Sequence, residues 1–146
     1  MKVFKSNLVK SSQSFGENKA DNLSLIKKLR ELEKRAEKKS EERRSRFEER
    51  SQLSPRERLN ALIDPGLPFL ELFNMTGYLV DDDNPETTIP GASMITGIGY
   101  VSSIRCMIWV DDSGINAGAI TMKSVQKGLA CIHMAKTQKL PLVHLV

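Results

Sequence analysis

The sequence predicts an α/β domain that follows a charged, helical N-terminal segment. Two β-prone runs, Ala92–Tyr100 and Ile104–Val110, flank a short polar turn and indicate a hairpin. The helical pattern of Ser124–Lys139 and the apolar run Leu140–Val146, expected to be a buried strand, come next. The order of elements is therefore strand, strand, helix, strand. The length of 146 residues and the hydrophobic fraction of 40% are typical of one globular domain, not of a disordered chain.

The positive charge of the chain is confined to its first third. Residues 1–52 hold 15 Lys/Arg and 9 Asp/Glu, whereas residues 53–146 hold 7 and 9. Residues 1–20 lack apolar periodicity, so we expect a mobile arm there. A charged helix is expected over 21–52. Its basic residues alternate with Glu, and few aromatic residues lie among them. This pattern favours a salt-bridged helix over a nucleic-acid surface. Its first half carries a narrow apolar stripe at helical spacing, Leu25, Leu29, Leu32 and Ala36.

A second helix is predicted immediately after the charged segment. Ser54–Glu57 (SPRE) has the spacing of a capping box with proline at the first helical position. Asp64–Gly66 ends this helix. Phe69–Phe73 is predicted to be a short strand or turn, and the acidic, proline-containing stretch 81–91 is predicted to be a loop.

Two other motifs are expected to be structural. Thr96–Gly99 contains part of a dinucleotide-binding fingerprint, but the third glycine and the following helix are missing. Its glycines are therefore expected to permit close packing or a bulge. Cys131 and His133 would point about 200° apart on a helix, so they cannot share one metal ion with His144. Cys106 is expected to pack as a small hydrophobic residue.

A loop of small residues before the helix Ser124–Lys139 is the candidate ligand-binding segment. Small residues let the backbone approach a ligand and present N–H groups. Lysines on the following helix favour an anionic or carbonyl-bearing ligand. Glycine loops are also common before helices, so an ordinary connecting loop stays open as an alternative. The candidate residues are Asn116, Ala117, Gly118, Ala119, Lys123 and Lys127.

Four stretches carry a family resemblance: SPRERLNALIDPGLPFLEL, PGASMITGIGYVSSIRCMIWVDD, NAGAIT and KLPLVHLV. In this order they resemble the carboxyltransferase (β) subunits of biotin-dependent acyl-CoA carboxylases of the propionyl-, methylcrotonyl- and geranyl-CoA type. The resemblance implies a crotonase-like fold, a superhelix of repeated β-β-α units. Residues 53–146 would form part of its N-terminal, acyl-CoA-binding domain, preceded by charged helices.

The resemblance also implies an activity and its partners. In this family a carboxyl group passes from carboxybiotin to the α-carbon of an acyl-CoA, and peptide N–H groups stabilise the enolate. Biotin is carried by a partner, so this chain is expected to bind no cofactor itself. The implied partners are the acyl-CoA substrate, a biotin carboxylase/biotin carrier (α) subunit and other β subunits. Neither nucleic acid nor membrane is expected as a partner.

By the same resemblance, Asn116–Ala119 would lie near the thioester and pantetheine, and Lys123 and Lys127 would face the CoA phosphates. The family's strand that matches Leu140–Val146 leads into a glycine pair that forms an oxyanion hole. This chain ends before that pair and lacks the biotin-side domain, so we expect a fragment that is inactive alone. A cytoplasmic location is preferred, or the mitochondrial matrix in a eukaryote. The alternative left open is a non-catalytic protein-interaction module that uses the charged helix.

Overall fold

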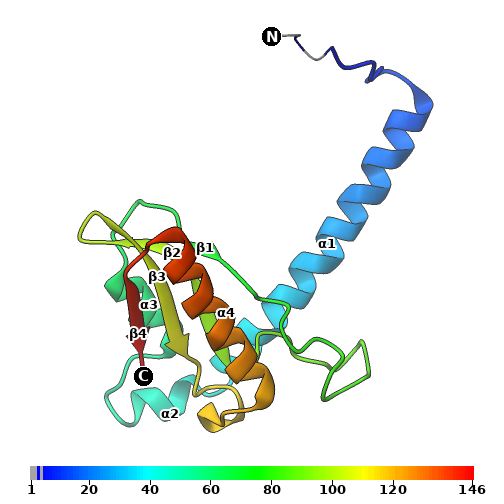
Figure 1. Ribbon diagram of the computed structural model, residues 1–146. Helices are drawn as coiled ribbons and strands as arrows, with labels where there is room; N and C mark the ends of the chain where they lie inside the picture. Colours follow the sequence, from blue (N-terminus) through cyan, green and yellow to red (C-terminus); the bar gives the residue numbers. More distant parts are fainter. Residues whose placement is uncertain (1–2, 4) are drawn as a thin grey trace. The chain divides into compact units, whose positions relative to one another are not determined.

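The strands of this computed structural model, which describes residue 3 and residues 5–146, form one mixed sheet (Figure 1). In the order β1-β2-β3-β4, the first two neighbouring pairs are antiparallel, and β3 and β4 are parallel. The predicted α/β class and the order strand, strand, helix, strand are confirmed. The strands are β1 (Leu70–Glu71), β2 (Met94–Val101), β3 (Ile104–Asp111) and β4 (Leu142–Leu145).

The chain divides into two compact units, Met1–Leu32 and Glu33–Val146, and the boundary falls within the first helix. This division differs from the boundary at residue 53 that the sequence indicates. No helix of the described residues is long and apolar enough to cross a bilayer. The helices are α1 (Gln13–Glu41), α2 (Arg44–Glu48), α3 (Pro55–Leu62), the 3-10 helix η1 (Asn116–Gly118) and α4 (Met122–Gln138).

The first helix begins earlier and ends earlier than predicted. It starts at Gln13, not at Asp21, so part of the expected arm is helical. The Ser12 hydroxyl accepts a hydrogen bond from the Phe15 amide at 3.2 Å, which caps the helix start. The expected single helix over 21–52 is also wrong, because α1 ends at Glu41 and a separate short helix, α2, follows.

Strand β3 is the centre of the core, because helices cover both of its faces (Figure 1). One face packs with Leu59 of α3, and the other packs with Cys131 and Ala135 of α4. Alternate side chains of a strand point to opposite faces, so a nearly continuous apolar run is what this two-sided burial requires. The α3 face carries Cys106, Ile108 and Val110, and the α4 face carries Met107.

Strand β4 lies at the edge of the sheet and is not buried as predicted. It pairs with β3 in the register Trp109↔His144. Its side chains alternate between exposed and half-buried, and Leu142 is 41% exposed. An apolar run indicates a strand, but it does not tell on which side neighbours are present.

The predicted close packing at the glycine-bearing strand β2 is confirmed. Glu71 of β1 pairs with Gly97 of β2. A Cβ atom at Gly97 would collide with the carbonyl oxygen of Leu70 and would lie 2.5 Å from Cζ of Phe69. Strand β1 and the Phe69 ring therefore reach this part of β2 only because residue 97 has no side chain.

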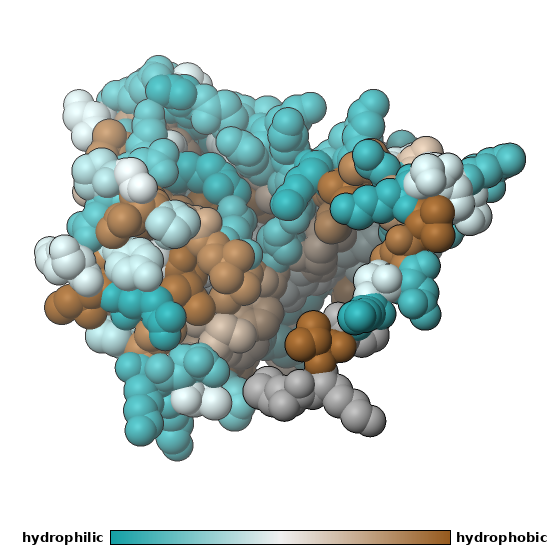
Figure 2. Space-filling model, turned by 90° about the horizontal axis from the view of Figure 1, so that it is seen from above, coloured by the Kyte–Doolittle hydropathy of each residue, from teal (hydrophilic) through white to brown (hydrophobic). Residues whose placement is uncertain are grey.

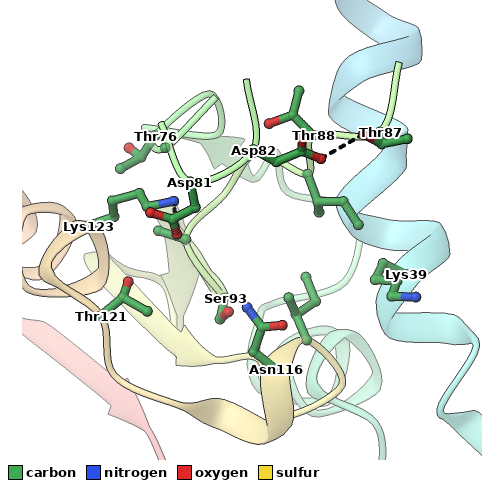
Figure 3. A pocket seen from close by; sticks show the side chains of 14 residues that line it. Lys39, Thr76, Asp81, Asp82, Thr87, Thr88, Ser93, Asn116, Thr121 and Lys123 are labelled. Carbon is green, nitrogen blue, oxygen red and sulfur yellow. Dashed lines mark hydrogen bonds and ion pairs between the residues drawn. The ribbon is translucent and has the colours of Figure 1, made fainter. Parts of the chain in front are cut away.

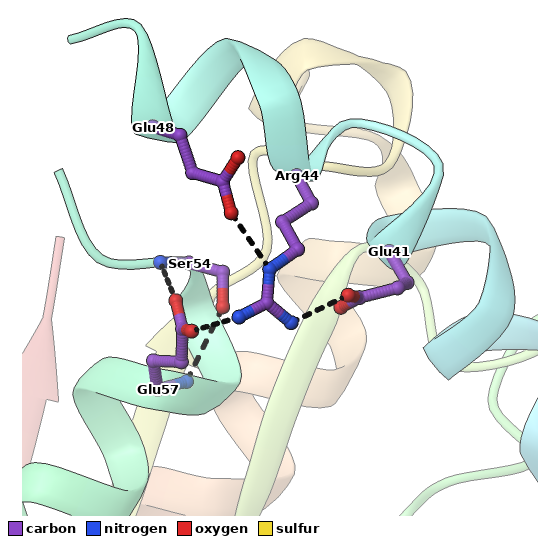
Figure 4. A network of polar contacts seen from close by, with 5 residues as sticks. All are labelled: Glu41, Arg44, Glu48, Ser54 and Glu57. Atoms are coloured by element: carbon purple, nitrogen blue, oxygen red, sulfur yellow. Dashed lines mark hydrogen bonds and ion pairs between the residues drawn. The ribbon is translucent and has the colours of Figure 1, made fainter. Parts of the chain in front are cut away.

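The predicted capping box at the start of α3 is confirmed and extends into an ionic network (Figure 4). The Ser54 amide donates to Glu57 Oε2 at 2.8 Å, and the Glu57 amide donates to the Ser54 hydroxyl at 3.4 Å. The hydrogen bond from the Ser54 amide lowers the pKa of Glu57. Arg44 of α2 contacts Glu57 and also Glu41 and Glu48, so the charged segment is salt-bridged as predicted.

Replacing Ser54 by alanine is expected to lower the unfolding free energy by about 1 kcal/mol, since the first turn of α3 loses its side-chain acceptor. Urea titration followed by circular dichroism measures this change. Ser102→Ala is the matched control, because Ser102 is exposed and its hydroxyl bonds to no described residue; we expect a change below about 0.5 kcal/mol. Equal effects of the two substitutions would contradict a capping role for Ser54.

Candidate functional site

The predicted ligand-binding loop lies where the sequence places it, between β3 and α4. It forms η1 with positive φ at Asn116 (49°), Ala117 (53°) and Gly118 (76°). The Gly118 and Ala119 amides donate within the loop, to the carbonyls of Ile115 and Asn116, each at 3.0 Å. Within the described residues, the Asn116 and Ala117 amides make no hydrogen bond, and both residues are exposed.

A buried carboxylate anchors the start of this loop. Asp112 is 3% exposed, and its Oδ1 accepts from the Ser40 hydroxyl at 2.6 Å and from the Gly114 amide at 3.0 Å. Burial raises the pKa of Asp112, and the two hydrogen bonds partly oppose this rise. The last turn of α1 thus fixes the loop through Ser40. This contact could not be predicted from the sequence near Asp112, because Ser40 lies far away in the chain.

On one side of the loop lies a polar pocket of about 230 Å³ (Figure 3). Asn116 lines it, and so does Lys123 from the first turn of α4. The Lys123 ammonium forms an ion pair with Asp81 from the predicted acidic loop. The structure therefore brings two of the predicted site residues together, and it adds an acidic residue that is not among the predicted ones.

On the other side of the loop lies a mainly apolar pocket of about 300 Å³. Gly118 and Ala119 line its edge, and Trp109 together with the side chains of Leu129 and Ile132 forms its wall. Leu129 is 60% exposed, so this wall is accessible to a ligand. Hydrophobic side chains also reach the surface elsewhere, as the face drawn in Figure 2 shows. The first residue of the loop thus lines a polar pocket, and its last two residues line an apolar one.

An aromatic and acidic cluster closes one end of the apolar pocket. The Trp109 indole N–H donates to Asp111 Oδ1 at 2.7 Å, and His144 Nε2 lies 3.1 Å from Asp111 Oδ2. The two rings stack with centroids 4.3 Å apart. These residues are not grouped by any sequence motif; their signal is the i, i+2 spacing of Trp109 and Asp111 on one strand, next to the parallel strand that carries His144.

The face of α4 that packs against the sheet carries small apolar residues and a lysine, and its larger apolar residues point away from the sheet. Leu129 and Ile132 are exposed, whereas Lys127 is 1% exposed. Lys127 Nζ donates to the carbonyls of Gly91 at 3.0 Å and Met94 at 2.7 Å. The expectation that Lys127 faces CoA phosphates is therefore not retained, because backbone carbonyls already hold its ammonium inside the domain.

The two cysteines are free and buried, as expected of structural thiols. Cys131 lies on the buried face of α4, whereas His133 is exposed, so the two point apart as predicted. Burial raises the pKa of the Cys131 thiol. Among residue 3 and residues 5–146, no group of three or more His, Cys, Asp or Glu side chains is arranged to hold a metal ion.

Residues 46–146, which include the loop Asn116–Ala119, match the family of the carboxyl transferase domain. The chain belongs to this family. The assignment confirms the resemblance carried by the four sequence stretches. It supports the carboxyltransferase interpretation over the alternative of an interaction module built on the charged helix.

Two curated relatives of this carboxyl transferase domain carry names of acyl-CoA carboxylase β subunits. The biotin-dependent 3-methylcrotonyl-coenzyme A carboxylase beta1 subunit of Mycobacterium tuberculosis is 39% identical over 73% of this chain and 20% of its own length. The probable mitochondrial methylcrotonoyl-CoA carboxylase beta chain of Drosophila melanogaster is 30% identical over 99% of this chain and 25% of its own length. The carboxyl transferase domain described here thus spans a fifth to a quarter of these relatives.

Two solved structures are similar to this chain. The β subunit of geranyl-CoA carboxylase from P. aeruginosa is similar with a TM-score of 0.88 and 37% identity, over 98% of this chain and 26% of that chain. The transcarboxylase 12S structure has a TM-score of 0.69 and 20% identity, over 83% of this chain and 24% of that chain. At that identity the second likeness shows only that the fold is shared.

Proposed function

We propose that this chain is the acyl-CoA-binding portion of an acyl-CoA carboxylase β subunit. In the full-length subunit a carboxyl group would pass from carboxybiotin, carried on a partner protein, to the α-carbon of an acyl-CoA. The observation that carries the proposal is the position of Asn116–Ala119 between a polar and an apolar pocket, inside the segment that matches the family. A thioester of coenzyme A has the same two-part chemistry, a phosphorylated end and an apolar end.

The two pockets give the ligand an orientation. Lys123 would meet the phosphates on the polar side, because an ammonium donates charge-assisted hydrogen bonds to phosphate oxygens. Gly118 and Ala119 would lie beside the pantetheine and thioester, with the acyl group against Trp109. Ala117 would offer its free amide to the thioester region, since its N–H meets no described acceptor.

The wider assembly follows from the family and forms part of the same proposal. Residues 53–146 would be the first β-β-α unit of a crotonase-like superhelix, completed by further units of the full-length subunit. Its partners would be the biotin carboxylase/biotin carrier subunit and other β subunits, in the bacterial cytoplasm or, in a eukaryote, in the mitochondrial matrix. Because this chain spans only a fifth to a quarter of its relatives, we expect residues 1–146 to bind acyl-CoA without carboxylating it.

Calorimetric titration with coenzyme A tests the polar side. Lys123→Ala is expected to weaken binding about tenfold, because one charge-assisted contact to phosphate is lost. Lys136→Ala is the matched control, since Lys136 is an exposed lysine on the last turn of the same helix and should leave the affinity unchanged. An absence of binding, or equal affinities of the three proteins, would contradict the proposal.

The apolar side has its own readout in the same titrations. Trp109 is the sole tryptophan of the sequence and lines the apolar pocket, so its fluorescence reports occupancy of that pocket. A medium-chain acyl-CoA should change the emission more than coenzyme A does. Identical emission changes with both ligands would show that the acyl group lies elsewhere.

A further inference from the structure

The ion pair in the polar pocket places an acidic side chain on the lysine that the proposed function assigns to a ligand anion. Asp81 lies in the acidic loop (residues 81–91), and its carboxylate contacts the Lys123 ammonium (Figure 3). The Lys123 side chain is 15% exposed, whereas that of Asp81 is 68% exposed. The lysine is thus held in place, while the aspartate can move into solvent at little cost.

The backbone under Lys123 explains why the lysine is fixed. A Cβ atom at Gly77 would lie 2.6 Å from Lys123 Cδ, and Gly77 has φ of +81°. The aliphatic part of Lys123 therefore runs directly across Gly77, which aims its ammonium into the polar pocket. A lysine guided in this way presents its charge at one position, with or without Asp81.

The acidic loop has its own internal bracing, which leaves Asp81 free for Lys123. Asp82 is used inside the loop, where its carboxylate accepts from the Thr87 hydroxyl at 2.7 Å and from the Asn84 amide at 3.0 Å. Arg35 of α1 donates to the carbonyl of Pro85 at 2.6 Å. The loop thus keeps its shape without the Lys123 contact, and that contact joins it to α4.

We propose that Asp81 stands in for a phosphate on Lys123, so that the acidic loop closes the polar pocket until a phosphate-bearing ligand displaces it. This inference rests on the proposed function, because Lys123 must be the phosphate-binding residue. A phosphate carries a larger negative charge than a carboxylate and has more acceptor oxygens, so it competes favourably for the same ammonium. The Asp81 side chain is 68% exposed, so its carboxylate returns to water at a small cost in free energy when the ligand replaces it.

We call the contact between Asp81 and Lys123 the latch. Calorimetric titration of the full 146-residue chain with coenzyme A tests it. Asp81→Asn is expected to tighten binding about two- to fivefold, because the ligand no longer competes with the exposed Asp81 carboxylate for Lys123. Asp83→Asn is the matched control, since it removes the same charge from an exposed position two residues away in the same loop and should leave the affinity unchanged. Pantetheine, which lacks phosphates, should bind Asp81→Asn and the unchanged chain equally.

The double variant separates the latch from the site itself. In a Lys123→Ala chain the added Asp81→Asn change should have no effect on affinity, because the competitor has lost its target. If Lys123→Ala weakens coenzyme A binding but Asp81→Asn does not tighten it, the latch is wrong and the proposed function stands. If Asp81→Asn weakens binding, the loop supports the ligand and the latch is overturned. If no variant binds coenzyme A, both proposals fail.

Discussion

Replacing Gly97 by alanine is expected to lower the unfolding free energy by about 3 kcal/mol, because the added methyl group collides with the backbone of the paired strand β1. The new Cβ would collide with the carbonyl oxygen of Leu70 and press on the Phe69 ring. Relief requires β1 to leave β2, which would break the bond from the Leu72 amide to the Thr96 carbonyl at 2.7 Å. Urea titration followed by circular dichroism measures the loss.

Gly16→Ala is the matched control for that substitution. Gly16 lies in α1, and a Cβ atom there would meet nothing within 4 Å. Alanine is favoured over glycine inside a helix, so the same chemical change should be neutral or stabilising by up to about 1 kcal/mol. A loss below about 1 kcal/mol for Gly97→Ala would contradict the tight approach of β1 to β2.

The unfolding free energy is expected to rise by about 1 kcal/mol from pH 7 to pH 9 on account of Lys127. Burial lowers the pKa of this lysine from the ordinary 10.5 to about 8, and the nearby Glu71 carboxylate partly opposes the change. Between these two values the unfolded chain binds the proton more tightly than the folded chain does. Raising the pH through this window therefore favours folding. The raised pKa of Cys131 has the opposite effect, which begins only above its ordinary value of 9.0.

Lys127→Met removes the titrating group while keeping an unbranched side chain of similar length. We expect the rise in unfolding free energy between pH 7 and pH 9 to disappear in this variant, as measured by urea titrations at several pH values. Lys136→Met on the exposed face of α4 is the control and should keep the rise. A slope that survives Lys127→Met would assign the pH dependence to other groups.

Much of the fold could be predicted because its signals are local. The capping box at Ser54 and the hairpin of β2 and β3 depend on residues close together in sequence, and both are confirmed. The helical stretch before Asp21 was missed because it has an exposed surface and thus no apolar periodicity. Its signal was the cap at Ser12, three residues before Phe15.

The site was predicted less completely, because its contacts join distant residues. The position of Asn116–Ala119 followed from the order of strand and helix. The burial of Lys127 could not be predicted, since its acceptors, the carbonyls of Gly91 and Met94, come from a turn more than 30 residues away. Apolar periodicity on α4 identified a helix, yet the close packing of Trp109 against Gly128 decides which face meets the sheet.

The hydrogen bond from Ser40 to Asp112 has a consequence for where this domain can be cut. The family match begins at residue 46, but the compact unit begins at Glu33. A polypeptide trimmed to the family match would keep the buried Asp112 carboxylate and lose the hydroxyl that compensates it. The loop Asn116–Ala119 would then lose the contact that holds its start in place, even though every residue of the loop was retained. The N-terminal boundary of an expressed domain should therefore lie upstream of Ser40, within α1, the first part of the charged segment.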